Sequence, residues 1–353
     1  MLTISSRVIL ATMVALIAGL PAIAAADDVA RDKELLKQAR DLFQPLPKDI
    51  STPEYPVTKE RVALGRSLFF DMRFSIDGNL GCVSCHQPAL YGTDGRSRSI
   101  GVKGRLHPRH APTVLNAPLQ FVIHWRGDRV DAEDQVAQSL LSPITSGQPD
   151  EKAVLARVNG IPGYAPLFKE AFPNDPEPVS RKNMALAIGA FERTLVTPSR
   201  FDDYLKGDVD ALSTQERAGL AKFIDVGCIA CHNGPGVGGS MYQKFGVMED
   251  YWNVTRSDPV DKGRAEVTHN DADLYVFKVP SLRNVAMTPP YFHDGSVATL
   301  AEAVETMGRL QLGAKLEDRD VAAIVSFLAS LTGPLPQGFA TAPVLPSGSV
   351  LVR

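Results

Sequence analysis

Apolar residues recur with helical spacing in most periodic stretches of this 353-residue chain, and few stretches alternate with the two-residue period of a strand. Between residues 180 and 195, Met184, Ile188 and Phe191 fall on one helix face, which favours a core role for Met184. We therefore predict a mainly α-helical protein. The predicted helices cover residues 33–43, 59–70, 131–141, 151–158, 180–195, 213–224, 299–307 and 320–331.

Helix-ending and helix-starting residues divide the chain into two halves. Thr197-Pro198 ends one helix, and Ser213 opens the next with a capping box that Glu216 completes. Residues 88–130 are rich in glycine, proline and arginine and are typical of a long loop. The predicted divisions are a signal peptide (1–26), an N-terminal domain (27–197), a C-terminal domain (198–335) and an extended tail (336–353).

The N-terminus has the pattern of a secretory signal. Arg7 precedes an apolar run from Val8 to Leu20, and small residues follow from Ala22 to Ala26. An uncleaved anchor is the alternative, but the run is short for a membrane span. We predict cleavage near the end of the alanine-rich stretch and a periplasmic protein that is not membrane-embedded. The net charge of −3, without a basic run, does not favour nucleic acid as a partner.

All four cysteines lie in two copies of Cys-x-x-Cys-His, which is the attachment signature of c-type haem. A helical turn places both thiols on one side, and the histidine that follows can reach the iron. A zinc site would bring the cysteine pairs closer in sequence, and a disulfide leaves the histidines unexplained. We predict two covalently bound haems, attached at Cys82, Cys85, Cys228 and Cys231, with His86 and His232 as proximal iron ligands. Gly65-x-x-Leu68-Phe69 before the first motif loosely matches Gly219-x-x-x-Phe223 before the second, as duplicated modules would.

The sixth ligand of each iron is less determined by pattern. Met307 ends a predicted helix in the same half as His232, although periodicity alone favours a core role for it. His107 and His110 follow the first motif within reach of its haem, and His293 is a further candidate. No motif supports the remaining two histidines, His124 and His269.

Trp125 is one of only two tryptophans and lies between the two haem motifs in sequence. Tryptophan is usually a large buried anchor. In a protein with two haems, Trp125 is also a candidate to assist electron transfer between them.

Short motifs spread along almost the whole mature chain point to one protein family. They are Gly65-x-x-Leu68-Phe69-Phe70-Asp71-x-Arg73, Cys82 to His86, Gly92-Thr93-Asp94, Ala111 to Asn116, Cys228 to Pro235, Val237-Gly238-Gly239, Phe277 to Asn284, Tyr291 to Gly295 and Val304 to Gly308. With these motifs the chain resembles the bacterial dihaem cytochrome c peroxidases, a family that also contains MauG-type enzymes.

The resemblance implies two cytochrome c-like haem domains with long loops. It implies an N-terminal haem of low potential where peroxide reacts, and a C-terminal haem of high potential ligated by His232 and Met307. MauG-type enzymes carry a tyrosine at the position of Met307, so the methionine favours the peroxidase branch. Trp125 matches the family tryptophan that lies between the haems.

Two departures from the family pattern concern the first haem. Val102 stands where many members carry a capping histidine, so that this haem is either open without reductive activation or capped by another group such as His107. Thr145 stands where the family has the glutamate that assists O–O cleavage, a proton carrier normally giving about 10²–10⁴-fold. Candidate substitutes are His107, Arg126 and a water held by Thr145 or Gln148.

A third departure concerns calcium. His110 stands where the family has an asparagine associated with a calcium ion between the domains. The backbone carbonyls of Thr288 and Pro290 remain as candidate ligands, so the sequence leaves calcium in question.

The main hypothesis is a periplasmic cytochrome c peroxidase that reduces hydrogen peroxide to water. Electrons would come singly from a small cytochrome c or cupredoxin to the second haem, and pass near Trp125 to the haem of His86. A homodimer is compatible with this reading. The alternatives are a MauG-like oxidase that modifies a partner protein and a non-enzymatic carrier with two haems.

Overall fold

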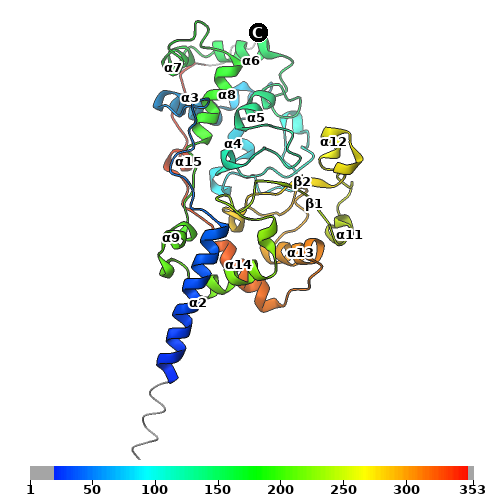
Figure 1. Cartoon of the computed structure of the whole chain (residues 1–353). Coiled ribbons are helices and arrows are strands. Elements are labelled where there is room, and N and C mark those ends of the chain that lie inside the picture. Colours follow the sequence, from blue (N-terminus) through cyan, green and yellow to red (C-terminus); the bar gives the residue numbers. More distant parts are fainter. Residues whose placement is uncertain (1–19, 349–353) are drawn as a thin grey trace, which may run out of the picture.

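The computed structural model describes residues 20–348, so the predicted signal peptide lies largely outside the described residues. The fold is mainly α-helical, as predicted, with one two-stranded sheet in which β1 (Tyr242–Lys244) and β2 (Val276–Lys278) pair antiparallel (Figure 1). The α-helices are α2 (Leu20–Leu42), α3 (Lys59–Phe70), α4 (Cys82–Cys85), α5 (Ala132–Ser139), α6 (Glu151–Asn159), α7 (Tyr164–Ala171), α8 (Arg181–Glu192), α9 (Arg200–Lys206), α10 (Thr214–Asp225), α11 (Tyr251–Thr255), α12 (Ala265–Thr268), α13 (Leu300–Leu312), α14 (Asp318–Ser330) and α15 (Gln337–Ala340).

Most predicted helices begin and end within a few residues of the observed ones, but α2 begins at Leu20 instead of residue 33, and α13 ends later than predicted. The sequence prediction ended it at Met307 before Gly308, whereas the helix continues to Leu312. Gly308 is buried inside the helix, and the C-cap is Gly313, whose φ of 63° suits glycine. Met307 therefore lies in the middle of a helix and not in its last turn.

The helices that carry the two larger hydrophobic cores lie one above the other in Figure 1. The upper core contains residues between Leu64 and Leu195, and the lower core contains residues between Phe201 and Leu331. The predicted boundary near residue 197 falls between these two sets of residues. The side-chain amides of Asn116 and Asn284, one from each half, both donate to the hydroxyl of Thr197 at 2.8 Å.

The two ends of the chain cross over between the cores, which corrects two of the expected divisions. Helix α2 precedes the first haem motif in sequence, yet its Leu35 and Ala39 pack in the lower core. The C-terminal tail is not extended throughout, because α15 forms one helical turn whose Phe339 is fully buried in the upper core. Burial of a large apolar side chain such as Leu35 or Phe339 contributes about 1.5–3 kcal/mol, which explains why neither end stays with its own half.

Each core is built around one close crossing of two helices. In the upper core α3 crosses α8 at Gly65, and a Cβ on Gly65 would lie 1.8 Å from the carbonyl oxygen of Ala187. In the lower core α10 crosses α14 at Gly219, and a Cβ there would lie 1.9 Å from the carbonyl oxygen of Ala323. Gly65 and Gly219 are the glycines whose neighbouring residues matched in the sequence, so the two halves pack one helix pair in the same way.

A second repeated feature joins these helix pairs. Residues 116–139 and 284–307, which we call the repeat segments, have the same succession of local structures, and each member of the second follows its counterpart by the same number of residues. Both begin with an asparagine in the left-handed region and end in a capped helix. The counterparts are Asn116 and Asn284, the 3-10 helices Ala117–Leu119 and Val285–Met287, the bridges Ile123–Arg129 and Tyr291–Val297, Gly127 and Gly295, and the N-caps Asp131 and Thr299 of α5 and α13.

Candidate functional site

Two cavities of about 370 Å³ each lie in the described part of the chain, one around each Cys-x-x-Cys-His motif. The first cavity is lined by Cys82, Cys85 and His86. The second is lined by the second motif and, from α13, by Met307. The predicted attachment and ligand residues are therefore brought together in two groups, as their sequence positions suggested.

The motif histidines present neutral rings to the cavities. Nδ1 of His86 lies 2.9 Å from the carbonyl oxygen of Gly92, which leaves Nε2 free for a metal. Burial lowers the pKa of His86, and it lowers the pKa of His232 to about 4. Nδ1 of His232 is buried without a hydrogen bond of standard geometry, although the backbone of Val237 and Pro280 lies close to it. Neutral imidazole is the form that binds iron.

The four thiols are free, and they face the same cavities as the histidines. Burial raises the pKa of Cys82 to about 12 and those of Cys85 and Cys228 to about 11, so that these thiols are protonated near neutral pH. Each cavity thus combines two free thiols with the neutral imidazole of its own motif. This donor set fits one haem per cavity, with a histidine on one face of the iron.

The repeat segments place one equivalent residue in the wall of each cavity. Ser139 on α5 and Met307 on α13 lie the same number of residues after their N-caps, Asp131 and Thr299. Both residues line their own cavities. The thioether available in the second cavity is therefore replaced by a serine hydroxyl in the first. A serine hydroxyl is a poor ligand for haem iron, whereas methionine is an established one.

Trp125 lies in the wall that the two cavities share, because it lines both of them. Its indole Nε1 donates to the carbonyl oxygen of His110 at 2.9 Å, and its own carbonyl accepts from the backbone N–H of Lys278 at 2.8 Å. Its ring lies 6.4 Å from that of His293, its counterpart in the second repeat segment. The indole is therefore held from both halves of the molecule.

The candidate histidines differ in their surroundings. His293 is buried in the wall of the second cavity, where its ring stacks on Phe277 with centroids 4.3 Å apart. His110 lines both cavities. It is fixed between the halves, because its ring Nδ1 lies 2.6 Å from the carbonyl oxygen of Arg96 and its backbone N–H donates to the carbonyl of His293. His269 is exposed and lines neither cavity.

His107 and Thr145 both line the first cavity, as candidate residues for peroxide chemistry should. Nε2 of His107 is buried without a hydrogen-bond partner, and burial lowers the pKa of the ring. Val102 is buried but does not line the cavity, and its backbone N–H donates to the carbonyl of Ile144. Gln148 also lies outside the cavity wall, and its amide donates to the carbonyl of Phe74 at 2.8 Å.

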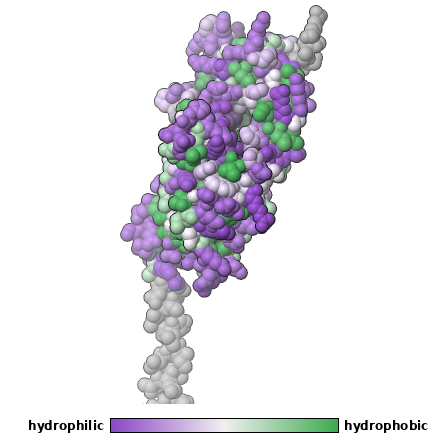
Figure 2. Space-filling model, turned by 90° about the vertical axis from the view of Figure 1, so that its right-hand side faces the viewer, coloured by the Kyte–Doolittle hydropathy of each residue, from purple (hydrophilic) through white to green (hydrophobic). Residues whose placement is uncertain are grey.

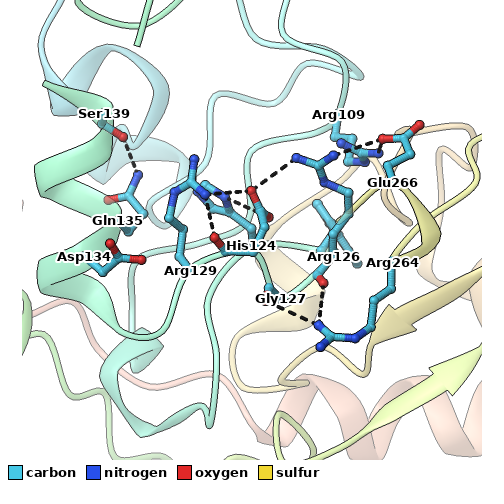
Figure 3. Close-up of polar contacts among 12 residues, drawn as sticks. Arg109, His124, Arg126, Gly127, Arg129, Asp134, Gln135, Ser139, Arg264 and Glu266 are labelled. Carbon is cyan, nitrogen blue, oxygen red and sulfur yellow. Dashed lines mark hydrogen bonds and ion pairs between the residues drawn. The ribbon is translucent and has the colours of Figure 1, made fainter. Parts of the chain in front are cut away.

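Further polar residues of the first cavity were missed by the sequence prediction. Figure 3 shows Gln135 and Ser139 on α5, whose side chains bond at 2.8 Å, with Arg129 and His124 beside them. His124 had been set aside for want of a motif. The signal that would have found it is the common spacing of the repeat segments, which becomes visible only after both are folded.

The described residues show neither a membrane span nor an acidic or histidine-rich metal cluster. Within residues 20–348, none of the helices combines the length and apolar character needed to cross a bilayer. The same residues contain no group of three or more His, Cys, Asp or Glu side chains placed to hold a metal ion. The face drawn in Figure 2 is mostly hydrophilic, with hydrophobic residues in small scattered groups.

Comparison with known proteins gives consistent matches. Residues 59–210 match the family of di-haem cytochrome c peroxidases. The chain is 44% identical to a cytochrome c551 peroxidase of Nitrosomonas europaea, over 80% of this chain and 82% of that protein. It is 40% identical to a cytochrome c551 peroxidase of Pseudomonas aeruginosa, over 92% and 93%. A solved structure of a MauG-like protein associated with microbial copper homeostasis matches with a TM-score of 0.75 at 29% identity, over 83% of this chain and 96% of that chain.

Proposed function

The chain belongs to the family of di-haem cytochrome c peroxidases, and from this premise we propose that it reduces hydrogen peroxide to water at its first haem. The electrons come one at a time from a small cytochrome c or cupredoxin in the bacterial periplasm. Haem bound in the two cavities supplies the iron at which peroxide binds and through which the electrons pass. A homodimer, which the family resemblance allows, stays a prediction.

The observation that carries this assignment is the difference between Ser139 and Met307 at equivalent places of the two cavities. Met307 is the proposed second axial ligand beside His232, and a His/Met pair raises the reduction potential. Ser139 leaves the side facing His86 without a strong protein ligand at this place. Peroxide therefore has access to the first cavity, while the second is suited to hold an electron.

The residues between the cavities support transfer from one to the other. Trp125 lines both cavities and is anchored by hydrogen bonds from its ring to His110 and from Lys278 to its carbonyl. An aromatic ring fixed in the common wall keeps the path between the haems short and rigid. We propose that electrons pass through this wall.

Covalent attachment follows from the thiols. We propose that each S–H of Cys82, Cys85, Cys228 and Cys231 adds across one vinyl group, with the hydrogen going to the vinyl carbon, so that a thioether forms without an external oxidant. This attachment would take place after export, once residues 1–26 have been removed.

Steady-state peroxide consumption tests the proposal. The holoprotein, matured with both haems and supplied with a reduced small c-type cytochrome, is expected to oxidise two donor molecules for each hydrogen peroxide consumed. Donor oxidation followed optically, against peroxide followed by an electrode, gives this ratio. The absence of peroxide-dependent donor oxidation with several cytochromes and a cupredoxin would contradict the proposal.

Met307→His is expected to lower the reduction potential of the second haem. The reason is that methionine favours the reduced iron more than a second imidazole does, and the shift should be at least about 59 mV, a tenfold change in the one-electron equilibrium. Spectroelectrochemical titration measures it. Met248→Leu is the matched control, because Met248 is 61% exposed and lies outside the cavity wall. An unchanged potential in Met307→His would show that the sulfur is not a ligand.

A further inference from the structure

Breaking the O–O bond of peroxide requires a group that moves a proton from one oxygen to the other, and such a group gives about 10²–10⁴-fold. Thr145 cannot do this near neutral pH. The carrier must therefore be sought among the other titratable side chains that line the first cavity.

Several of these side chains are committed elsewhere. Asp71 is paired with Arg73 and accepts from the hydroxyl of Tyr164 at 2.8 Å. Nδ1 of His110 is held at the carbonyl of Arg96. Glu192 contributes to raising the pKa of the Cys82 thiol, which places its carboxyl group near the site of haem attachment. His107 and His124 remain.

Comparison of the two repeat segments distinguishes His124 from His107 as a candidate. The counterpart of His124 in the second segment is Phe292, which lines the second cavity as His124 lines the first. Both residues have a positive φ, 68° for His124 and 70° for Phe292. The same position therefore carries the apolar Phe292 beside the proposed electron-storing haem and a histidine, which can exchange a proton, beside the proposed peroxide-reducing haem. Non-glycine residues rarely adopt this backbone region, so the fold holds the ring at this place against some strain.

The ring of His124 is also oriented by charge. Nδ1 lies 3.3 Å from Oδ1 of Asp128, so that Nδ1–H faces the carboxylate and Nε2 is the nitrogen left to accept a proton. Burial alone would raise the pKa of Asp128, but His124, Arg126 and Arg129 together hold it well below its usual range. Asp128 is therefore a fixed anion that keeps one orientation of the imidazole.

Arg129 adds a positive charge beside the ring. Its Nη1 donates to the carboxylate of Asp128 at 2.9 Å, while its Nε is buried without a partner and its side chain lines the same cavity (Figure 3). Arg126 bonds two carboxylates, with Nη1 donating to Oε2 of Glu266 at 3.0 Å and Nη2 donating to Oδ2 of Asp128 at 3.1 Å. The charged groups beside His124 are thus Asp128, Arg126 and Arg129 from its own loop, and the uncharged rings of His107 and His86 line the same cavity.

We propose that His124, oriented by Asp128, is the proton carrier for peroxide cleavage, and that Arg129 stabilises the charge that develops. This inference rests on the proposed function and names the residue that performs it. Nε2 takes the proton from one oxygen of hydrogen peroxide and returns it to the other, and this second oxygen leaves as water as the O–O bond breaks. The oxygen atom left behind takes up two electrons from the donor and two protons, and leaves as the second water.

The test compares His124→Phe, which copies Phe292, with wild-type holoprotein in two rapid-mixing measurements. The first follows the change of haem absorption on mixing with hydrogen peroxide. The second follows binding of cyanide, which enters as hydrogen cyanide and must give up its proton to a base. His124→Phe is expected to lower the rate constant with peroxide by about 10²–10⁴-fold and to slow cyanide binding as well. His124→Gln should behave similarly, because glutamine cannot carry the proton.

The controls separate this inference from others. His269→Phe replaces an exposed histidine outside both cavities and should react like wild type. Asp128→Asn should lose less than His124→Phe, because the ring remains but is no longer held in one orientation. Equal rates in His124→Phe and wild type, or a loss in His107→Phe with none in His124→Phe, would overturn the inference. If wild type itself does not react with peroxide, the proposed function fails, and the cyanide measurement still reports on His124.

Discussion

Gly65→Ala and Gly219→Ala should each lower the free energy of unfolding by about 3 kcal/mol, at the upper end of the usual cost of overpacking. The added methyl group would lie 1.8 Å from the carbonyl oxygen of Ala187 in one case and 1.9 Å from that of Ala323 in the other. Both obstacles are backbone atoms of a partner helix, so no side-chain rotation relieves the overlap. The helices must move apart, and each crossing then loses its packing.

Urea unfolding followed by circular dichroism measures this loss, with the midpoint and slope fitted together. Gly338→Ala is the matched control, because a Cβ at that position meets no atom within 4 Å. It should leave the stability unchanged or raise it slightly, since alanine is the better helix former. Unchanged stability in Gly65→Ala would show that α3 and α8 can separate at little cost, and that the stability of the upper core does not depend on this close crossing.

The equivalence of these two glycines shows what the sequence could predict. The helical period identified α3 with the observed ends, because its apolar face and its N-cap Thr58 are local features. The haem motifs were equally local, since two thiols and a histidine on one turn need no other part of the chain. Candidate ligands such as Met307 could be named from the family pattern, and the structure places it in the wall of the second cavity.

The remaining features depend on contacts between distant segments. Helical periodicity does not show that α2 packs in the lower core or that Phe339 packs in the upper core. Each of these contacts depends on a partner far away in sequence. His124 is a similar case. Its candidate role comes from the comparison with Phe292. The two repeat segments share backbone conformation and spacing more clearly than they share side chains. The end of α13 was misplaced because two glycines follow closely and only one can be the cap.

Glu192→Gln should remove a pH dependence of stability that this one carboxyl group creates. Glu192 is 5% exposed and lines the first cavity at the end of α8. Burial is the main cause that raises its pKa from 4.5 to about 8; the charge of Glu133 adds to this, and Arg193 opposes it. The folded protein therefore keeps a proton that the unfolded chain loses above pH 4.5.

The sign follows from this difference in bound protons. Between pH 4.5 and about 8 the folded state holds one proton more than the unfolded state, so the free energy of unfolding falls by about 1.4 kcal/mol per pH unit. Below the window both states are protonated and the group has no effect. Above it both are ionised and the full loss, on the order of 5 kcal/mol, remains.

Glutamine has nearly the shape of the protonated carboxyl group but does not titrate. The free energy of unfolding of Glu192→Gln minus that of wild type should therefore be nearly constant below pH 4.5. It should then grow with pH and level off near pH 8. Urea unfolding of both proteins at each pH measures this difference, in which the titration of all other groups cancels. Glu170→Gln, on the exposed surface of α7, is the matched control and should show no such growth.

The same measurement tells whether the cavity wall is neutral when haem is bound. A difference that does not change between pH 5 and pH 8 would mean that the carboxyl group is ionised in the folded holoprotein, and a positive group in the cavity would then have to compensate it. A difference that grows as expected places a neutral acid beside the sulfur of Cys82, where an ionised carboxylate would be repelled by that of Glu133. In that case His124 and Glu192 divide the first cavity, one exchanging protons on the peroxide side and the other keeping its proton beside the haem attachment.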